Sequence, residues 1–173
     1  MDRPPTSPRH PQYQCGILTL SDKGSAGLRE DESGELLKDI LSRQGFVVAV
    51  YQVIADEETL ISETLIDWCD GLRLDLIVTT GGTGVSPRDR TPEATMAVLD
   101  REIPGISEAM RMKSLMVTPR AMLSRGRSGI RGQTLIINLP GSTKAARENI
   151  ATILPCLTHA IDKIQGGSDD CGG

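Results

Sequence analysis

The sequence predicts an α/β domain with a mostly parallel sheet and helices on both faces. Short apolar runs of strand length alternate with amphipathic segments of helix length between residues 15 and 165. Polar segments that contain small residues follow four of these runs, and ligands bind at such positions in open α/β sheets. At 173 residues the chain can bury a substantial core. We expect a flexible Pro-rich tail at 1–12, a single domain at 13–166 and a flexible tail at 167–173.

The composition argues against several classes of protein. A net charge of −4 and an aromatic content of 2% give no reason to expect nucleic-acid binding. The four cysteines include no C-x-x-C pair, so we interpret them as reduced thiols of a cytosolic protein, mostly in the core. Only two histidines are present, which argues against a His-based triad. No apolar run approaches the ~20 residues of a membrane span, and we expect no signal peptide at 1–12.

The first part of the chain contains two predicted strands, at 15–20 and 46–54, around a helix at 33–44 that Gly45 ends. The polar loop at 21–27 is either a ligand-binding loop or an ordinary turn. Asp56 follows the second strand. It is either the N-cap of the next helix or a carboxylate that faces a ligand crevice. That helix buries a face ending in Trp68, which we interpret as a core residue and not a ligand platform.

The segment 76–93 is the centre of the prediction. A buried strand at 75–80 leads into Gly81, Gly82, Thr83 and Gly84, where backbone N–H groups can point at a phosphate. The alternative is a tight turn that only joins a strand to a helix. A helix start follows, with Thr91 as the N-cap, Pro92 at the first helical position and a positive dipole end.

Two common phosphate-binding motifs do not fit this segment. A Walker loop needs Lys-Ser/Thr after the last glycine, where Val85 stands. The dinucleotide fingerprint needs a third glycine where Pro87 stands, and no strand ending in Asp or Glu follows about twenty residues later. An unrelated nucleotide-binding α/β domain is therefore disfavoured.

The rest of the chain continues the alternation. We expect a helix over 92–101, a break at 103–105, a second helix from Ile106, a strand at 134–139 and a long final helix capped by Ser142 or Thr143. Pro155 should kink that helix, and glycines at 166–167 should end it. The segment 126–132 is either a mobile surface loop or a hairpin. The polar loops after the four strands should gather along one edge as a single ligand crevice.

Two features in this part have open interpretations. The basic stretch at 111–131 is a solvated face, a subunit interface, or a source of one or two cations for ligand phosphates. The methionines in and near it are gap-filling core or interface residues: Met110, Met112, Met116 and Met122.

The chain contains Thr-Gly-Gly-Thr-Gly at 80–84, Pro-Arg-Asp at 87–89 and Thr-Pro-Glu-Ala-Thr at 91–95. Together these segments resemble the MogA/MoaB family, which includes molybdopterin adenylyltransferases and the G domain of gephyrin. Further matches lie at 20–22, 56–57, 104–105, 121–125, 129–132 and 136–141, so the resemblance spans about 15–165. This joint match is far more specific than a glycine triplet alone.

The resemblance implies a three-layer α/β fold, a homotrimer, and Mg²⁺-dependent transfer of AMP from ATP to the terminal phosphate of molybdopterin. The product would pass to a molybdate-inserting enzyme in the cytoplasm. The two aspartates that the family needs fall on Asp56 and Asp89, and its pterin-site serine falls on Ser114. The phosphate-binding loop falls on Gly81, Gly82, Thr83 and Gly84. Candidate nucleotide contacts are Ser21, Asp22, Pro140 and Gly141.

The implied chemistry suits these residues. The attack of one phosphate on another needs backbone N–H groups, positive charge and a divalent cation, with little covalent participation. Asp56 and Asp89 are hard oxygen ligands, so we assign them to Mg²⁺ as a hypothesis. The alternative within the family is a non-catalytic molybdopterin-binding carrier or scaffold of the MoaB type. The presence of both carboxylates favours the enzyme.

Overall fold

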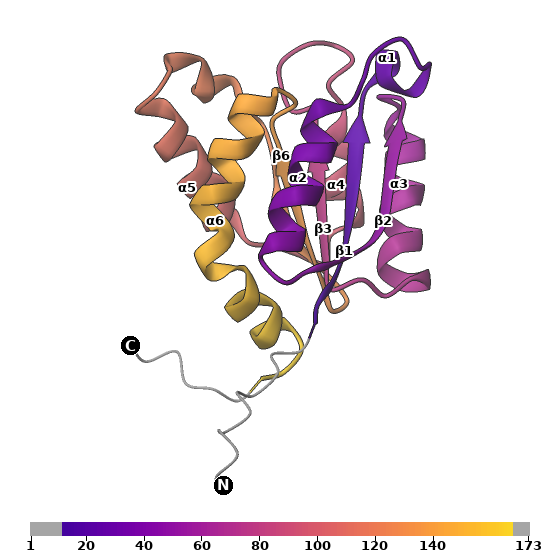
Figure 1. The fold of residues 1–173 in the computed structure, drawn as a ribbon, viewed down its shortest axis with the longest axis vertical. Coiled ribbons are helices and arrows are strands. Elements are labelled where there is room, and N and C mark those ends of the chain that lie inside the picture. Colours follow the sequence, from indigo (N-terminus) through magenta and orange to yellow (C-terminus); the bar gives the residue numbers. More distant parts are fainter. Residues whose placement is uncertain (1–11, 168–173) are drawn as a thin grey trace, which may run out of the picture.

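A computed structural model describes residues 12–167, which form one six-stranded sheet with the order β2-β1-β3-β6-β5-β4 (Figure 1). The parallel strands are β1 (Gln14–Leu20), β2 (Val47–Ile54), β3 (Leu76–Thr80) and β6 (Thr134–Leu139). The strands β5 (Ser128–Arg131) and β4 (Arg101–Glu102) are antiparallel and form one edge. The predicted fold class is confirmed. The predicted tails lie, apart from residues 12 and 167, outside the described residues.

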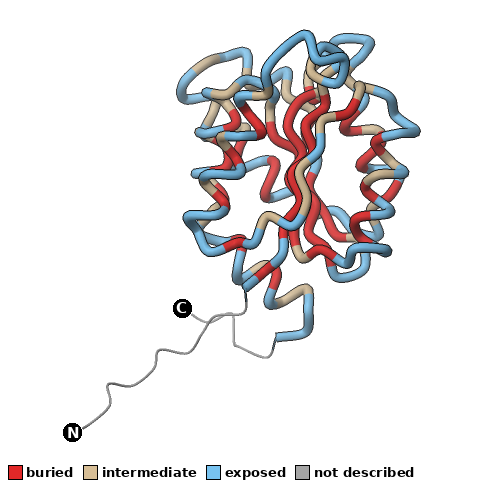
Figure 2. The backbone as a smooth tube through the Cα atoms, turned by 45° about the vertical axis from the view of Figure 1, so that its right-hand side comes forward, coloured by how far each residue is buried: buried red, intermediate tan, exposed pale blue. Residues whose placement is uncertain are grey.

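Helices cover both faces of the sheet and enclose two cores. The helices α2 (Glu32–Arg43), α5 (Pro104–Leu115) and α6 (Thr143–Ile164) pack on one face. The other face is covered by α3 (Glu58–Ile66), the π-helical turn η1 (Asp67–Gly71) and α4 (Thr91–Val98). Neighbouring strand residues such as Ile17 and Leu18 belong to opposite cores, which explains why β1, β3 and β6 are apolar on both sides. Figure 2 shows the buried residues concentrated along the strands between the two layers of helices. No helix within residues 12–167 is long and apolar enough to span a membrane.

Local sequence signals place the helix ends. Asp31 caps α2 by accepting a hydrogen bond from the Gly34 N–H (3.0 Å), and Gly45 beyond its end has a φ of +89°. Ser142 caps α6 by accepting from the Ala145 N–H (3.2 Å), as predicted for Ser142 or Thr143. The 22-residue α6 continues through Pro155, and Gly166 follows its end with a φ of +89°.

The helix predicted over 92–101 ends at Val98, so the prediction is wrong for its last residues. The backbone becomes extended at Leu99, and Arg101–Glu102 form β4 beside β5. The Asp100 N–H donates to the Ile130 carbonyl (2.8 Å), and the Ile103 N–H donates to the Ser128 carbonyl (2.8 Å). These backbone bonds to a distant strand override the local helical preference.

The structure settles three of the open interpretations. The segment 126–132 contains one strand of a hairpin, and Ser128 and Ile130 are buried, so the mobile-loop interpretation is wrong. Trp68 is a core residue with 3% of its surface exposed. Met110 is buried, whereas Met112, Met116 and Met122 are exposed, so the core interpretation is wrong for these three.

The cysteines partly match their predicted place in the core. Cys15 and Cys69 are buried, and burial raises the pKa of both thiols, to about 12 and about 11. Cys156 is exposed, and Cys171 lies outside the described residues.

Candidate active site

The polar loops that follow the parallel strands meet at one edge of the sheet, as predicted. After β1, the Ser21 N–H donates to the carbonyl of Ile54 at the end of β2 (2.9 Å). After β3, the Gly81 N–H donates to the carbonyl of Leu139 (3.2 Å), at the end of β6. The Thr80 hydroxyl donates to the Pro140 carbonyl (2.8 Å). These bonds join the end of β1 to the end of β2, and the end of β3 to the end of β6.

The glycine loop needs its glycines for close packing. Gly81 and Gly82 have φ values of +102° and +64°, which disfavour residues with a Cβ atom. A Cβ on Gly81 would lie 2.3 Å from the Leu20 carbonyl oxygen, and one on Gly82 would lie 2.3 Å from Thr91 Oγ1. The Thr91 hydroxyl donates to the Gly81 carbonyl (2.9 Å), which ties the loop to the start of α4.

This contact changes the predicted cap of α4. Arg90 occupies the N-cap position and makes no side-chain cap hydrogen bond, whereas Thr91 and Pro92 are the first two residues of the helix. The N-cap prediction for Thr91 is therefore wrong by one position, because its hydroxyl bonds to the glycine loop instead.

Two cavities lie on either side of the glycine loop. The larger has a volume of about 550 Å³ and the smaller about 370 Å³. Both are lined by Gly82, Asp89, Gly141 and Ser142. The glycine loop and the start of α6 therefore form a common wall, and groups bound in the two cavities could meet across it.

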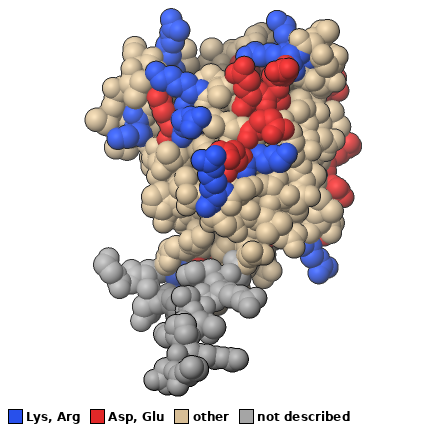
Figure 3. Space-filling view, viewed as in Figure 1, with Lys and Arg blue, Asp and Glu red and all other residues tan. Residues whose placement is uncertain are grey.

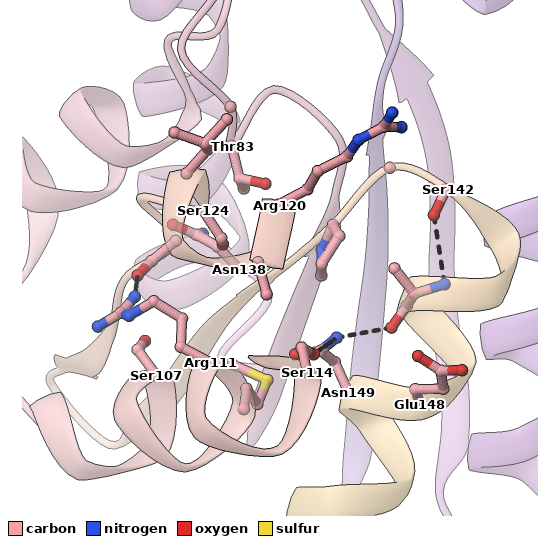
Figure 4. Close-up of a pocket in the computed structure, with 18 of the residues that line it drawn as sticks. Thr83, Ser107, Arg111, Ser114, Arg120, Ser124, Asn138, Ser142, Glu148 and Asn149 are labelled. Carbon is pink, nitrogen blue, oxygen red and sulfur yellow. Dashed lines mark hydrogen bonds between the residues drawn. The ribbon is translucent and has the colours of Figure 1, made fainter. Parts of the chain in front are cut away.

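The larger cavity lies between α5, α6 and the 3₁₀ turn η2 (Pro119–Leu123) (Figure 4). Its lining combines apolar groups such as Met110 with hydroxyl, amide and guanidinium groups. Ser114 Oγ accepts a hydrogen bond from Asn149 Nδ2 (3.1 Å), which leaves the Ser114 hydroxyl hydrogen free to bind another acceptor. Figure 4 places Ser114 and Asn149 together on one side, with Arg120 above them.

Asn138 is a residue of this site that sequence reasoning missed. Its Nδ2 atom donates to Thr79 Oγ1 and Thr95 Oγ1 (3.0 Å each), and its Oδ1 atom accepts from the Arg127 N–H (3.0 Å). An asparagine in an otherwise apolar strand was the available signal. Its position at the end of β6 gives the cavity a fixed polar group.

The smaller cavity is bounded by the end of β1, the segment 29–33 and the start of α6. Asp31 accepts hydrogen bonds from the Tyr51 hydroxyl (2.6 Å) and Ser33 Oγ (3.1 Å). Burial alone would raise the pKa of Asp31, but hydrogen bonds from Tyr51, Gly34 and Ser33 help to lower it overall. The sequence analysis did not identify Asp31 as part of the wall of a cavity, although an aspartate just before a helix indicates an ordered N-cap.

Asp56 is not the N-cap of α3, because Glu57 occupies that position. The Asp56 carboxylate lines the smaller cavity instead, beside the glycine loop. Burial raises its pKa, a hydrogen bond with the Asp22 backbone lowers it, and the negative charges of Asp22 and Asp89 raise it further. The charge of Arg88 lowers it, and the net shift is upward, with burial as the largest cause.

Asp89 lies on the wall that the two cavities share. Its Oδ2 atom accepts from the Ser86 N–H (2.8 Å), and a Cβ on Gly84 would lie 2.9 Å from the same oxygen. The absence of a side chain at Gly84 therefore makes room for this carboxylate.

The carboxylate pair fits the requirements of Mg²⁺. Within residues 12–167, no group of three or more His, Cys, Asp or Glu side chains is arranged to hold a metal ion. Mg²⁺ commonly takes one or two carboxylates and completes its shell with water and substrate phosphates. Asp56 and Asp89 both line the smaller cavity, so together they offer Mg²⁺ two hard carboxylate ligands.

The remaining predicted residues divide between the cavities. Thr83, Gly84, Ser114 and Pro140 line the larger cavity, and Ser21 and Gly81 line the smaller one. Asp22 lines neither cavity. Its carboxylate binds the Arg88 guanidinium through Nε (3.0 Å) and Nη2 (2.8 Å), which lowers its pKa.

The arginines of the basic stretch at 111–131 also fall into two groups. Arg111 and Arg120 line the larger cavity, whereas Arg125, Arg127 and Arg131 pair with carboxylates. Figure 3 shows basic and acidic side chains side by side toward the end of the molecule where the parallel strands terminate.

The site and fold define an α/β domain that binds ligands at the carboxyl ends of its strands. Residues 16–159 match the family model described as "Probable molybdopterin binding domain", and the chain belongs to this family. The predicted family is thereby confirmed.

Known relatives carry consistent names. A molybdopterin adenylyltransferase of Helicobacter pylori (strain ATCC 700392 / 26695) is 45% identical over 153 residues, which cover 87% of each chain. That of Escherichia coli K12 is 41% identical over 140 residues, covering 79% of this chain and 71% of the relative. Gephyrin of Dictyostelium discoideum is 45% identical over 163 residues, covering 88% of this chain and 23% of gephyrin.

Solved structures of proteins with similar names have the same fold. MoaB of Thermus thermophilus, titled a molybdopterin biosynthesis enzyme, has a TM-score of 0.85 and 51% identity, covering 89% of this chain and 97% of that chain. A MogA structure has a TM-score of 0.83 and 40% identity, covering 87% and 99%.

Proposed function

We propose that this protein transfers AMP from ATP to the terminal phosphate of molybdopterin, in a Mg²⁺-dependent reaction that yields adenylyl-molybdopterin. The observation that carries this proposal is the pair of cavities with a common wall at Gly82, Asp89, Gly141 and Ser142. A reaction between the phosphates of two substrates needs two neighbouring sites whose phosphate ends converge. The names of the relatives support the same activity.

The two cavities differ in a way that suits the two substrates. The larger contains apolar surface together with Ser114, Asn138 and Arg120, which suits a pterin with ring polar groups and a phosphate. The smaller is lined mainly by polar groups that include the Asp31 and Asp56 carboxylates, which suits ATP bound together with Mg²⁺. The start of α6, whose N-terminal dipole favours phosphates, borders both cavities. We assign molybdopterin to the larger cavity and ATP to the smaller one.

The proposed reaction is an in-line displacement at the α-phosphorus of ATP. A terminal phosphate oxygen of molybdopterin forms the new P–O bond, the bond to the β-phosphate bridging oxygen breaks, and pyrophosphate leaves with the electron pair. The backbone N–H groups of the loop from Gly82 to Gly84 would orient the phosphates, since the Gly81 N–H is already bound to the Leu139 carbonyl. Asp56 and Asp89 would hold Mg²⁺, which when bound supplies positive charge to the phosphates.

We also propose a cytoplasmic homotrimer that hands its product to a molybdate-inserting enzyme. Exposed apolar side chains near the end of α5 and on η2 support an assembly of copies. They include Met112, Leu115, Met116, Val117, Met122 and Leu123.

The competing function is a non-catalytic molybdopterin carrier or scaffold, as expected for the MoaB type. The structure at 51% identity bears the name MoaB, but it is described as a molybdopterin biosynthesis enzyme. A carrier needs only the larger cavity. A second cavity that contains the Asp56 carboxylate and shares Asp89 has a clear use only in the transfer reaction, which favours the enzyme.

Calorimetric titration with ATP, with and without Mg²⁺, followed by turnover with molybdopterin, tests the proposal. We expect Mg²⁺-dependent ATP binding and the appearance of AMP on the pterin. Pterin binding without any ATP dependence would support the carrier and refute the enzyme.

A further inference from the structure

Arg125 lies behind the loop that carries Asp89 and binds this loop at both of its ends. The Arg125 backbone N–H donates to the Thr83 carbonyl (2.8 Å), and Nε donates to the Gly84 carbonyl (2.6 Å). Nη2 donates to the Asp89 carbonyl (2.7 Å), and Nη1 donates to the Glu93 carboxylate. One residue therefore contacts the glycine loop, Asp89 and the first turn of α4.

The loop needs such support from outside. Residues 85–88 are exposed and form neither helix nor strand. Asp89 and Ser86 bind each other, since the Asp89 N–H donates to the Ser86 carbonyl (2.9 Å) and the Ser86 N–H donates to Asp89 Oδ2 (2.8 Å). This turn fixes the Asp89 carboxylate relative to Ser86. The Arg88 guanidinium ties the exposed part of the turn to Asp22 at the end of β1, and Arg125 ties Gly84 and Asp89 to the segment beside β6.

The chain around Arg125 is itself anchored to the sheet. The Arg127 N–H donates to Asn138 Oδ1 (3.0 Å), and the Asn138 N–H donates to the Arg127 carbonyl (2.9 Å). Asn138 belongs to β6, so Arg125 connects the loop to a central strand through two residues of backbone.

A cation in this position could instead serve substrate phosphates, but its surroundings argue against that. Arg125 lines neither of the two cavities. Its charge is offset by Glu93, whose pKa is lowered mainly by the hydrogen bond from Arg125. The planar guanidinium reaches three separate acceptors at fixed angles, which a lysine ammonium cannot reproduce.

We propose that Arg125 is a positioning residue that sets the place of Asp89 on the wall between the two cavities. This inference rests on the proposed adenylyl transfer. Displacement of a reacting or metal-holding group by ~1 Å can cost about 100-fold in rate. The Arg125→Ala variant should therefore lose about 100-fold in kcat, with molybdopterin affinity within about 3-fold of wild type.

Hydrogen–deuterium exchange of the segment 84–90, measured alongside kcat, tests the inference. Exchange should rise in Arg125→Ala and, to a lesser extent, in Arg125→Lys. Arg127→Ala is the matched control, because its side chain comes from the same segment and pairs with Glu102 on the surface (3.3 Å). This control should leave both exchange and kcat near wild type.

Glu93→Gln separates the ion pair of the Arg125 guanidinium from its hydrogen bonds to backbone carbonyls. It removes the charge partner and leaves the Gly84 and Asp89 carbonyls in place, so exchange and kcat should stay near wild type.

Unchanged exchange in folded Arg125→Ala, or a Glu93→Gln variant as impaired as Arg125→Ala, would overturn the inference. If Arg125→Ala does not fold, Arg125→Lys is decisive, and unchanged exchange and kcat in it would overturn the inference. A wild-type protein without transfer activity would refute the proposed function, while the exchange measurement would still test the support of the loop.

Discussion

Asp22 and Asp56 bind each other reciprocally where β1 and β2 end. The Asp22 N–H donates to Asp56 Oδ2 (3.1 Å), and the Asp56 N–H donates to Asp22 Oδ1 (3.0 Å). Arg88 offsets the charge of Asp22 by direct contact, so the charge that disfavours the native state is that of the more buried Asp56, whose pKa burial raises. The pair therefore holds the Asp56 carboxylate at the smaller cavity, and the burial of this charge lowers the free energy of unfolding.

Asp56→Asn should stabilise the protein at neutral pH. The folded-state pKa of Asp56 is raised above its ordinary 3.8, so stability is lost as the pH rises from 3.8 to the folded-state pKa, and the loss is complete above it. An asparagine keeps an oxygen acceptor without the charge. The free energy of unfolding should exceed that of wild type at pH 7, and the difference should shrink as the pH falls toward 3.8 and below. Urea denaturation across this range measures it.

Asp22→Asn is the matched contrast for this prediction. The hydrogen bond from Arg88 lowers the pKa of Asp22, so its charge favours the native state above the unfolded pKa. This variant should be less stable than wild type at pH 7 and approach it in acid. Equal changes in the two variants would contradict the assignment of the unfavourable charge to Asp56.

Gly81→Ala should destabilise the fold through both strain and a clash. A positive φ costs a residue with a side chain about 1–2 kcal/mol, and the added Cβ would lie 2.3 Å from the Leu20 carbonyl oxygen. We expect a loss of more than about 2 kcal/mol in the free energy of unfolding. Gly27→Ala separates the effects, since Gly27 has a φ of +72° and open space around its Cβ position. Equal losses in the two variants would refute the packing argument for Gly81.

Ser114→Ala should weaken molybdopterin binding about 10-fold, as expected for the loss of one hydrogen bond to a charged group. ATP affinity should not change, because Ser114 lines only the larger of the two cavities. Titration calorimetry with each substrate measures both values. Ser42→Ala on α2, outside both cavities, is the control. An effect on ATP alone would reverse the assignment of substrates to cavities.

The fold was predictable where burial leaves a pattern in the sequence. The strands β1, β3 and β6 are covered on both faces, so they are continuous apolar runs bounded by polar loops. The strand β4 has no such pattern, because Arg101 and Glu102 are exposed and join the sheet through their backbone pairing with β5. The cap at Thr91 was misplaced because its hydroxyl bonds to a residue 10 positions earlier.

The candidate site was predictable only in part. The rule that parallel strands end at one edge brought Asp56 and the glycine loop together. The same rule says nothing about Arg125, which reaches Asp89 from 36 residues away, or about Asn138, whose partner Thr79 is 59 residues away. Such contacts depend on tertiary packing, which one sequence does not encode in its local pattern.

The most direct test of the proposed function is adenylyl transfer by Asp89→Asn, measured as AMP incorporated into molybdopterin with saturating ATP and Mg²⁺. We expect wild type to form the product and the variant to lose at least about 100-fold in rate while binding molybdopterin normally. Asp39→Asn is the control, since Asp39 pairs with Arg43 on the exposed side of α2 (2.9 Å). Turnover retained in Asp89→Asn at the wild-type rate would contradict the role of this carboxylate on the wall between the two cavities.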